Sequence, residues 1–392
     1  MNIQGAERLK KLPVYLFDDL DAQKEAEEAK GVKVIDLGVG DPDRPTPDYI
    51  IQAMKQAVDD DRNHHYPSFK GMPEYRQAVA HWYKTNFNVD IDANSEVLGL
   101  IGSKRGVADL PMALCNPGDV VLIPDPCYTA YIPGIVLCGA EVHYMPLLEE
   151  NDFLPDLDAI PEDIRKRAKL MLLNFPGNPT AALGPLSFFE KVVPFAKENE
   201  IVVCHDAPYS EAIFDGNRQP SFLETPGAKD VGIEVHSVSK VFNMPGWRCA
   251  HAVGNAQVLS YLGKVRSNVD MGVFRPIQFA AIAALTGTMD FTRNMAMTYQ
   301  RRRDILCEGL NRLGWNVRKP PATFFVWTKV PQEGISSGDF AKDVLKKAGI
   351  VITPGIGFGQ HGEGYVRIAL TVEEEVYPEV IDRLEKAGFV YK

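Results

Sequence analysis

The sequence predicts an α/β protein in which a mostly parallel sheet flanked by helices is joined to a smaller α+β domain. Three observations support this prediction. Short apolar runs alternate with helical stretches, which is typical of strands buried on both faces of a parallel sheet. Polar residues capable of chemistry follow several of these runs, where such sheets place their ligands. From about residue 290 the pattern changes to a long polar helix followed by mixed strands and helices.

The elements of the sheet follow from these runs. A strand-like run precedes a helical stretch that begins near residue 103, and later runs are bounded by turn residues or helical segments. The expected strands are 97–101, 120–124, 141–144, 169–174, 201–205 and 233–237.

The second part begins with a long polar helix at 291–313. Strands at 315–318, 323–327 and 365–370 and a helix at 337–348 are expected to follow it. We expect the N-terminal segment to pack with this part. The prediction is therefore a large domain at 46–290 and a small domain built from 1–45 and 291–392. Because no repeat or flexible linker is visible, the two should pack tightly.

Composition narrows the class of protein. The chain has 392 residues, 45% of them hydrophobic and 24% charged, which is ordinary globular usage with enough length for two domains. A formal net charge of -10 argues against a nucleic-acid binder and favours small-molecule partners. The 6 cysteines show neither CxxC nor metal-ligand spacing, so we expect buried reduced thiols and no metal site. Without a leader-like start or an apolar run near the roughly 18 residues that span a bilayer, we expect a cytoplasmic protein.

The most informative run extends from Ser237 to Arg248 and places Lys240 between that serine and that arginine. A lysine amine can form a Schiff base with the aldehyde of pyridoxal phosphate, while a hydroxyl and a guanidinium fork suit its phosphate. A lone lysine in a serine-rich turn is more often a solvated surface residue. Residues upstream favour the functional interpretation, in which Lys240 is catalytic and Ser237 and Arg248 bind the phosphate.

Two upstream strand ends carry suitable side chains. Asn178 lies in a turn fixed by two prolines and a glycine, and it can donate to an oxygen such as the pyridoxal 3-hydroxyl. Asp206 follows a strand, where an unpaired carboxylate is costly to bury, and a pyridinium nitrogen would pair with it. Tyr209, three residues later, could reach the same 3-hydroxyl.

Further candidates are weaker when taken singly. Ser103 and Lys104 follow Gly102 at a helix start, where backbone N–H groups and the helix dipole can bind a phosphate. Tyr128 could stack on a cofactor ring, although an aromatic residue in a loop more often serves packing. Arg367, on the strand at 365–370, could grip a substrate carboxylate bidentately, with a structural salt bridge as the alternative.

One formal match is discarded. Residues 357–362 fit GxGxxG, the dinucleotide-binding fingerprint. That fingerprint requires a strand before it and a helix after it, whereas a strand-like run follows here. We do not predict a nucleotide site.

Taken together, these residues resemble the signature of the fold-type I pyridoxal-phosphate aminotransferases, the aspartate aminotransferase superfamily, over nearly the whole chain. The set is Tyr66, Gly102 to Lys104, Tyr128, Asn178 to Thr180, Asp206 to Tyr209, Ser237 to Lys240, Arg248 and Arg367. Within the superfamily, the runs at 37–42, 101–104, 155–160, 205–207, 220–223 and 362–367 look most like LL-diaminopimelate aminotransferases and their close relatives.

The resemblance implies a seven-stranded sheet in the large domain and transamination between an amino acid and a 2-oxo acid, with the 2-oxoglutarate/glutamate pair expected. It also implies a homodimer with shared active sites, in which Tyr66 reaches the cofactor phosphate of the partner. Lys240 would hold the cofactor and move the proton, Arg367 would bind the substrate α-carboxylate, and Gly38 would line the substrate pocket.

Three basic residues depart from the pattern of that subfamily, namely Lys70, Arg105 and Arg275. We predict Arg275 and Lys70 as substrate-binding residues that shift specificity toward dicarboxylic or neutral amino acids, unless they lie on the surface and select nothing. The alternatives are therefore an aminotransferase for dicarboxylic, alanine-type or aromatic amino acids, or a C–S lyase of the same fold. A non-enzymatic regulator is disfavoured, because the N-terminal segment is too short and acidic for a DNA-binding module.

Overall fold

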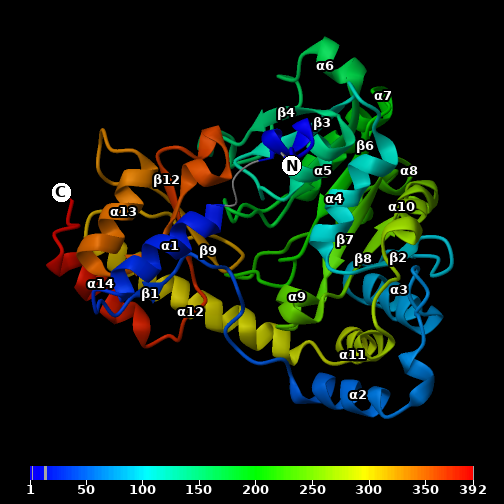
Figure 1. Cartoon of the computed structure of the whole chain (residues 1–392), viewed down its shortest axis with the longest axis horizontal. Coiled ribbons are helices and arrows are strands. Elements are labelled where there is room, and N and C mark those ends of the chain that lie inside the picture. The colour runs from blue at the N-terminus through cyan, green and yellow to red at the C-terminus, as the bar shows by residue number, and fades with distance from the viewer. Residues whose placement is uncertain (2, 13–15, 392) are drawn as a thin grey trace.

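The computed structural model describes residues 1, 3–12 and 16–391. A seven-stranded sheet in the order β2-β8-β7-β6-β5-β3-β4 lies in the right half of Figure 1. The strands are β2 (Val97–Leu100), β3 (Val120–Asp125), β4 (Glu141–Pro146), β5 (Ala168–Asn174), β6 (Val202–Asp206), β7 (Gly232–Ser237) and β8 (Ala250–Gly254). Strand β8 runs antiparallel to β2 and β7, and the pairs from β7 to β4 are parallel. The predicted mostly parallel sheet is confirmed. Strand β8 was missed because its sequence, AHAVG, lacks a β-branched run.

Helices cover both faces of the sheet. Side chains alternate along each strand, so Leu170 and Leu172 pack with one set of helices and Met171 and Leu173 with the other. The first set is α4 (Ser103–Leu114), α5 (Tyr131–Cys138) and α10 (Ala256–Val269). The second set includes α3 (Pro73–Phe87), α7 (Leu186–Glu198) and α11 (Arg275–Thr286), with α2 (Asp48–Val58) against α11. Shorter helices are α6 (Glu162–Arg167), α8 (Ala228–Val231) and α9 (Val238–Val241).

The same alternation sorts the polar residues at the end of β6. Cys204 packs with the cluster under α4, α5 and α10, and Asp206, two residues later, lies on that face. Val203 packs with the opposite cluster, and His205 lies on that face beside α7. Neighbouring residues of one strand are therefore directed to opposite faces of the sheet.

A second hydrophobic cluster lies beside the sheet, where the blue N-terminal and orange-red C-terminal elements meet in Figure 1. Its strands are β9 (Phe325–Lys329), β11 (Thr353–Pro354) and β12 (Tyr365–Ala369) in an antiparallel sheet, and β1 (Ile35–Asp36) paired in parallel with β10 (Ile350–Val351). The helices that contribute to it are α12 (Asp290–Arg312), α13 (Ser337–Ala348) and α14 (Val376–Lys386), and α1 (Leu16–Glu28) contacts α13. The 3-10 turns are Glu7–Lys11, Asp61–His64, Glu149–Asn151, Phe222–Glu224, Pro245–Trp247, Gly355–Phe358 and Gln360–Gly362.

The expected strand at 315–318 is wrong. Asn316 has a φ of 54°, and the backbone N–H of Val317 donates to Asn311 Oδ1, which ties this segment to the end of α12. Trp315 Nε1 donates to the Phe389 carbonyl instead of joining a sheet.

The domain boundaries at 45/46 and 290/291 stay a prediction, and residues 2, 13–15 and 392 of the predicted small domain lie outside the described residues. Pairing of β1 with β10 joins the N-terminal segment to the C-terminal part, whereas the turn Glu7–Lys11 contacts α5. Of the cysteines, Cys115 and Cys138 are only half-buried, because they lie near helix ends. In the described ranges, no helix combines the length and the apolar character needed to cross a membrane.

Candidate active site

A cavity of about 410 Å³ lies where the carboxyl ends of β5, β6 and β7 face β9 and β12. Parallel strands end at the same edge of the sheet, so residues distant in sequence meet there. The predicted site residues that line this cavity are Ser103, Lys104, Tyr128, Asn178, Asp206, Tyr209, Ser237, Lys240, Arg248 and Arg367.

Lys240 extends from α9 into the cavity. Its Nζ donates to the Gly40 carbonyl at 2.9 Å and lies 3.8 Å from Asp41 Oδ1. Burial lowers the pKa of Lys240 to about 8; Asp41 opposes this shift, and Arg248 and Arg367 add to it. Near neutral pH a much larger fraction of this amine is therefore uncharged, and hence nucleophilic, than in an exposed lysine.

Asp206 ends β6 with a buried and poorly satisfied carboxylate. Its Oδ2 accepts from the Tyr131 hydroxyl at 2.8 Å, and its Oδ1 has no hydrogen-bond partner within the described part of the chain. Burial raises the pKa of Asp206 to about 6, although the hydrogen bond from Tyr131 and the electrostatic interaction with His205 act in the opposite direction. Such a carboxylate is ready to accept from a cationic N–H group entering the cavity.

Groups suited to an anion lie at another part of the cavity. Helix α4 begins at Ser103 without a side-chain cap, and Gly102 precedes it with a φ of 78°. A Cβ on Gly102 would clash with the guanidinium of Arg248, so glycine is what lets that cation approach the helix start. Ser237 caps the short helix α9 by accepting from the Ser239 N–H at 3.1 Å. Backbone N–H groups, hydroxyls and a guanidinium converge as a phosphate requires.

Arg367 on β12 is buried, with its guanidinium carbon 4.1 Å from the centre of the Phe325 ring. Its Nη1 donates to Asn178 Oδ1 at 2.8 Å, and its Nη2 donates to the Gly38 carbonyl at 2.6 Å. Burial lowers the pKa of Arg367 to about 10, which still leaves it cationic at neutral pH. Gly38 therefore meets the site through its carbonyl, while Val39 and Gly40 line the cavity.

Comparison with known proteins decides the family. A model of aminotransferase class I and II matches residues 32–384. The chain is 52% identical over 384 residues to an LL-diaminopimelate aminotransferase of Syntrophobacter fumaroxidans, covering 98% of this chain and 99% of that protein. It is 50% identical over 390 residues to one of Halothermothrix orenii, covering 100% of both. The solved apo structure of BacF from Bacillus subtilis matches with a TM-score of 0.95 at 38% identity, covering 98% of both chains.

The chain belongs to the class I and II aminotransferases. It is therefore an enzyme that depends on pyridoxal phosphate and transfers an amino group between an amino acid and a 2-oxo acid. The resemblance expected from the sequence is confirmed.

The aminotransferase cavity fits this cofactor in three respects. The buried Oδ1 of Asp206 lacks a partner in the described residues, as expected of an acceptor for a protonated ring nitrogen. The uncapped start of α4 and Arg248 suit a phosphate, in the space that glycine keeps open at residue 102. Lys240 reaches the same cavity with a depressed pKa.

Aromatic residues complete the walls of the aminotransferase cavity. Tyr128 packs edge-on to Tyr131, with ring centres 5.7 Å apart. Tyr209 packs edge-on to Phe324 and Phe325, and burial raises its pKa. Its hydroxyl therefore remains protonated at neutral pH and can donate a hydrogen bond.

Sequence reasoning missed several residues of the site. Tyr131 holds Asp206, and Asn174 does so too by donating from Nδ2 to the Asp206 carbonyl at 2.7 Å. Asn174 also accepts from the Asn178 N–H at 2.7 Å, so its position at the end of a predicted strand was a usable signal. The Ser239 hydroxyl accepts from Ser237 at 2.9 Å. Phe325 had no such signal, because contact with Arg367 depends on pairing between β9 and β12.

The remaining predicted residues do not line this cavity within one chain. Tyr66 is 83% exposed. Lys70 is exposed beside a separate hollow next to α10, and Arg275 begins α11 with Nη1 donating to the Arg62 carbonyl at 2.7 Å. Arg105 forms an ion pair with the buried Asp109 at 2.7 Å. For Arg105 this favours the structural interpretation.

Proposed function

We propose that this aminotransferase takes LL-diaminopimelate as one amino partner and the 2-oxoglutarate/glutamate pair as the other. The observation that carries the proposal is the cavity itself, in which Lys240 is influenced electrostatically by both Arg248 and Arg367. One arginine would hold the cofactor phosphate and the other the substrate α-carboxylate. The substrate name comes from relatives that are 52% and 50% identical over nearly their whole length.

Each residue has a separable task in this proposal. Pyridoxal phosphate supplies an aldehyde and an electron-withdrawing ring when bound. Lys240 would be its covalent anchor and the base that moves the substrate α-proton. Asp206 would hold the proton on the ring nitrogen, and Asn178 and Tyr209 would donate to the ring oxygen. Ser103, Lys104, Ser237 and Arg248 would surround the phosphate, and Tyr128 would pack on the ring.

We further propose a homodimer with shared sites, in which Tyr66 contacts the cofactor phosphate of the partner. Exposed apolar side chains near the start of α11 support this proposal, because such patches mark interfaces. They are Val269, Met271 and Phe274, which are 52%, 54% and 39% exposed. Arg275 lies in the same region, and its side chain donates a hydrogen bond to the carbonyl of Arg62, four residues before Tyr66.

A complementation experiment tests the dimer. A Lys240→Ala subunit and a Tyr66→Ala subunit are each expected to be poorly active. In a mixed dimer, one site would combine an intact Lys240 with an intact Tyr66 from the neighbour. Mixing the two variants after reversible dissociation should therefore restore activity. If the mixture is no more active than its components although hybrids form, the sharing of sites is wrong.

A second candidate specificity is favoured by Arg275 and Lys70. Two cations beside the proposed interface would disfavour a substrate with a distal ammonium and favour a dicarboxylic donor. Under this alternative, Arg275→Gln should lower turnover of glutamate strongly and spare alanine. Near-wild-type turnover of glutamate by that variant counts against a role for Arg275.

The primary test is the absorbance spectrum of the purified protein during titration with LL-diaminopimelate, glutamate, aspartate, alanine and aromatic amino acids in the absence of any 2-oxo acid. A cofactor band that converts to the aminated form with LL-diaminopimelate supports the first proposal. Conversion only by dicarboxylic or neutral donors supports the alternative and makes the assigned substrate wrong. Release of pyruvate and ammonia without an acceptor would indicate a lyase.

A further inference from the structure

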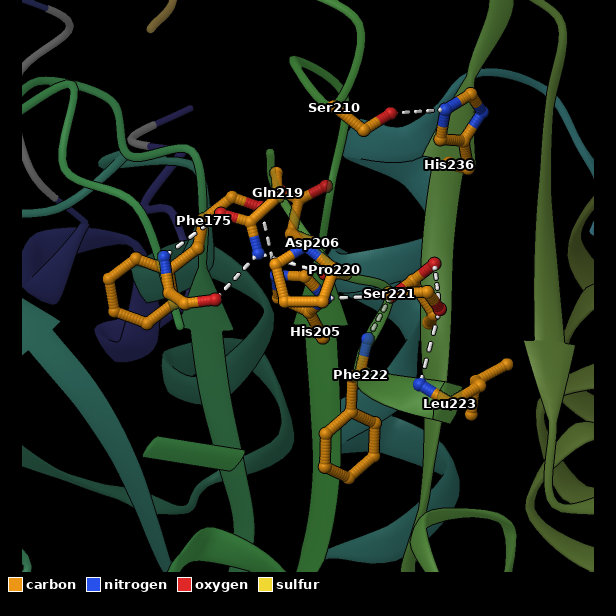
Figure 2. Close-up of polar contacts among 12 residues, drawn as sticks. Phe175, His205, Asp206, Ser210, Gln219, Pro220, Ser221, Phe222, Leu223 and His236 are labelled. Atoms are coloured by element: carbon orange, nitrogen blue, oxygen red, sulfur yellow. Dashed lines mark hydrogen bonds and ion pairs between the residues drawn. The ribbon is translucent and has the colours of Figure 1, made fainter. Parts of the chain in front are cut away.

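Directly behind Asp206, on the other face of the sheet, lies a buried pair formed by His205 and Glu234. Strands β6 and β7 place the two residues opposite each other in register, and both are at most 1% exposed. His205 Nδ1 lies 2.8 Å from Glu234 Oε2. Figure 2 shows His205 and Asp206 on one strand, with Ser221 and Phe222 beside them.

Glu234 is fully satisfied as an anion. Its Oε1 accepts from the hydroxyls of Tyr83 at 2.8 Å and Ser221 at 2.9 Å, and its Oε2 accepts from the Phe222 N–H at 2.9 Å as well as from His205. Burial alone would raise the pKa of Glu234, but these hydrogen bonds and the charge of His205 outweigh it, so its pKa lies below the usual value.

Both ring nitrogens of His205 face hydrogen-bond acceptors. Its second nitrogen, Nε2, lies 2.9 Å from the Phe175 carbonyl oxygen, which can only accept. The other nitrogen faces a carboxylate, so both contacts are hydrogen bonds only when both nitrogens carry a proton, which makes the ring an imidazolium. The neighbouring buried histidine, His236, differs. Its Nε2 faces the Ser210 hydroxyl, and burial lowers its pKa to about 4, so at neutral pH it carries no charge (Figure 2).

Asp206 is the group this cation can influence. It follows His205 directly in β6, and its carboxylate meets a single donor among the described residues, the Tyr131 hydroxyl. Burial raises the pKa of the Asp206 carboxyl, and the positive charge of His205 lowers it. Glu234 lies on the neighbouring strand β7 opposite His205, whereas Asp206 lies opposite Val235. Glu234 is therefore farther from Asp206 than His205 is.

We infer that the His205–Glu234 pair is a positioning element for the cofactor, a fixed buried imidazolium that keeps Asp206 anionic so that it pairs with the protonated ring nitrogen. His205 touches neither substrate nor cofactor and acts through Asp206. This inference rests on the assignment of Asp206 to the ring nitrogen proposed above. It adds residues of the opposite face of the sheet to the machinery of the reaction.

The test compares two cofactors on the full-length protein, stripped and reconstituted. One is pyridoxal phosphate, and the other is its analogue with C–H in place of the ring nitrogen. His205→Gln should weaken binding of pyridoxal phosphate about tenfold, the equivalent of one pKa unit of charge stabilisation. It should change the dissociation constant of the analogue by less than about twofold, because the analogue offers Asp206 no charged partner.

His236→Asn is the matched control, because it alters an equally buried histidine without removing a charge, and it should affect both cofactors alike. If His205→Gln does not give a cooperative melting transition, the neutral pair His205→Gln/Glu234→Gln is measured in its place, with the same expectation. Equal loss of affinity for the two cofactors, or no loss for either, overturns the inference.

The variant Asp206→Asn distinguishes a failure of the inference about His205 from a failure of the assignment of Asp206 to the ring nitrogen. If Asp206→Asn discriminates between the two cofactors and His205→Gln does not, only the role of His205 is wrong. If Asp206→Asn also fails to discriminate, the assignment of Asp206 to the ring nitrogen is wrong.

Discussion

Two buried carboxylates on neighbouring strands, Asp206 at the end of β6 and Glu234 in β7, differ in the number of donors they meet. Glu234 has four donors and a pKa below its usual value. Asp206 has one donor to its carboxylate in the described residues and a pKa raised to about 6. A buried carboxylate with few donors, such as Asp206, thus indicates the face of the sheet that binds a ligand. A buried carboxylate with a full set of donors, such as Glu234, indicates the face that has a structural role.

The largest effect is expected on the cavity face. Lys240→Ala removes both the covalent anchor and the proton carrier, so turnover should fall by at least about 10⁴-fold. The melting temperature of the cofactor-free protein should hardly change, because the cost of burying the Lys240 cation offsets its contacts with Gly40 and Asp41. Steady-state rates and thermal melts check this, with Lys191→Ala on the exposed side of α7 as the control. Activity within tenfold of wild type would contradict the assignment of Lys240.

The opposite face should respond in stability. Glu234→Ala leaves the buried His205 imidazolium without its anionic partner. This change should destabilise the cofactor-free protein by about 3–5 kcal/mol in urea unfolding. Asp206→Ala should change that stability by no more than about 1 kcal/mol, because relief of the buried charge offsets the lost acceptor of Tyr131. If Asp206→Ala were the more destabilising of the two, the contrast between the faces would be wrong.

Asp206 should also leave a signature in pH dependence. Its folded pKa of about 6 exceeds the unfolded value of about 3.9, so its contribution is fully present below pH 4 and is lost as pH rises through 6. Relative to Asp206→Asn, the cofactor-free wild type should lose about 2–3 kcal/mol between pH 4 and pH 7. Urea unfolding at several pH values measures this difference. Saturation with pyridoxal phosphate should abolish it, and a difference that is unaffected by the cofactor would argue against pairing with Asp206.

A site residue could be predicted from the sequence where its role depends on local spacing, but not where it depends on the pairing of distant segments. One short run of sequence contains Ser237, Lys240 and Arg248. Asn178 and Asp206 follow or end predicted strands. All five residues could therefore be predicted from local sequence. The ion pair of Arg105 with Asp109 follows an i, i+4 spacing that the prediction overlooked. Phe325 and the satisfaction of Glu234 depend on the registers of β9 with β12 and β6 with β7, which no local pattern encodes.

The smallest predicted effect sharpens the comparison most, because two tyrosines donate to the two carboxylates at the same distance. Tyr131 and Tyr83 are both buried and each hydroxyl lies 2.8 Å from its acceptor, Asp206 and Glu234 respectively. Tyr131→Phe removes the single donor to the Asp206 carboxylate among the described residues, so it should favour the protonated form and weaken pyridoxal phosphate binding about tenfold, or about 1.4 kcal/mol.

Tyr83→Phe leaves Glu234 with three donors, so it should lower stability by about 1 kcal/mol and leave the dissociation constant of the cofactor within about twofold. Cofactor titration and urea unfolding of both variants give a crossed pattern if the two faces have separate tasks. Equal effects of the two substitutions on cofactor binding would mean that the faces are coupled beyond the charge of His205, since the loss of one hydroxyl from a satisfied anion would then reach the cavity.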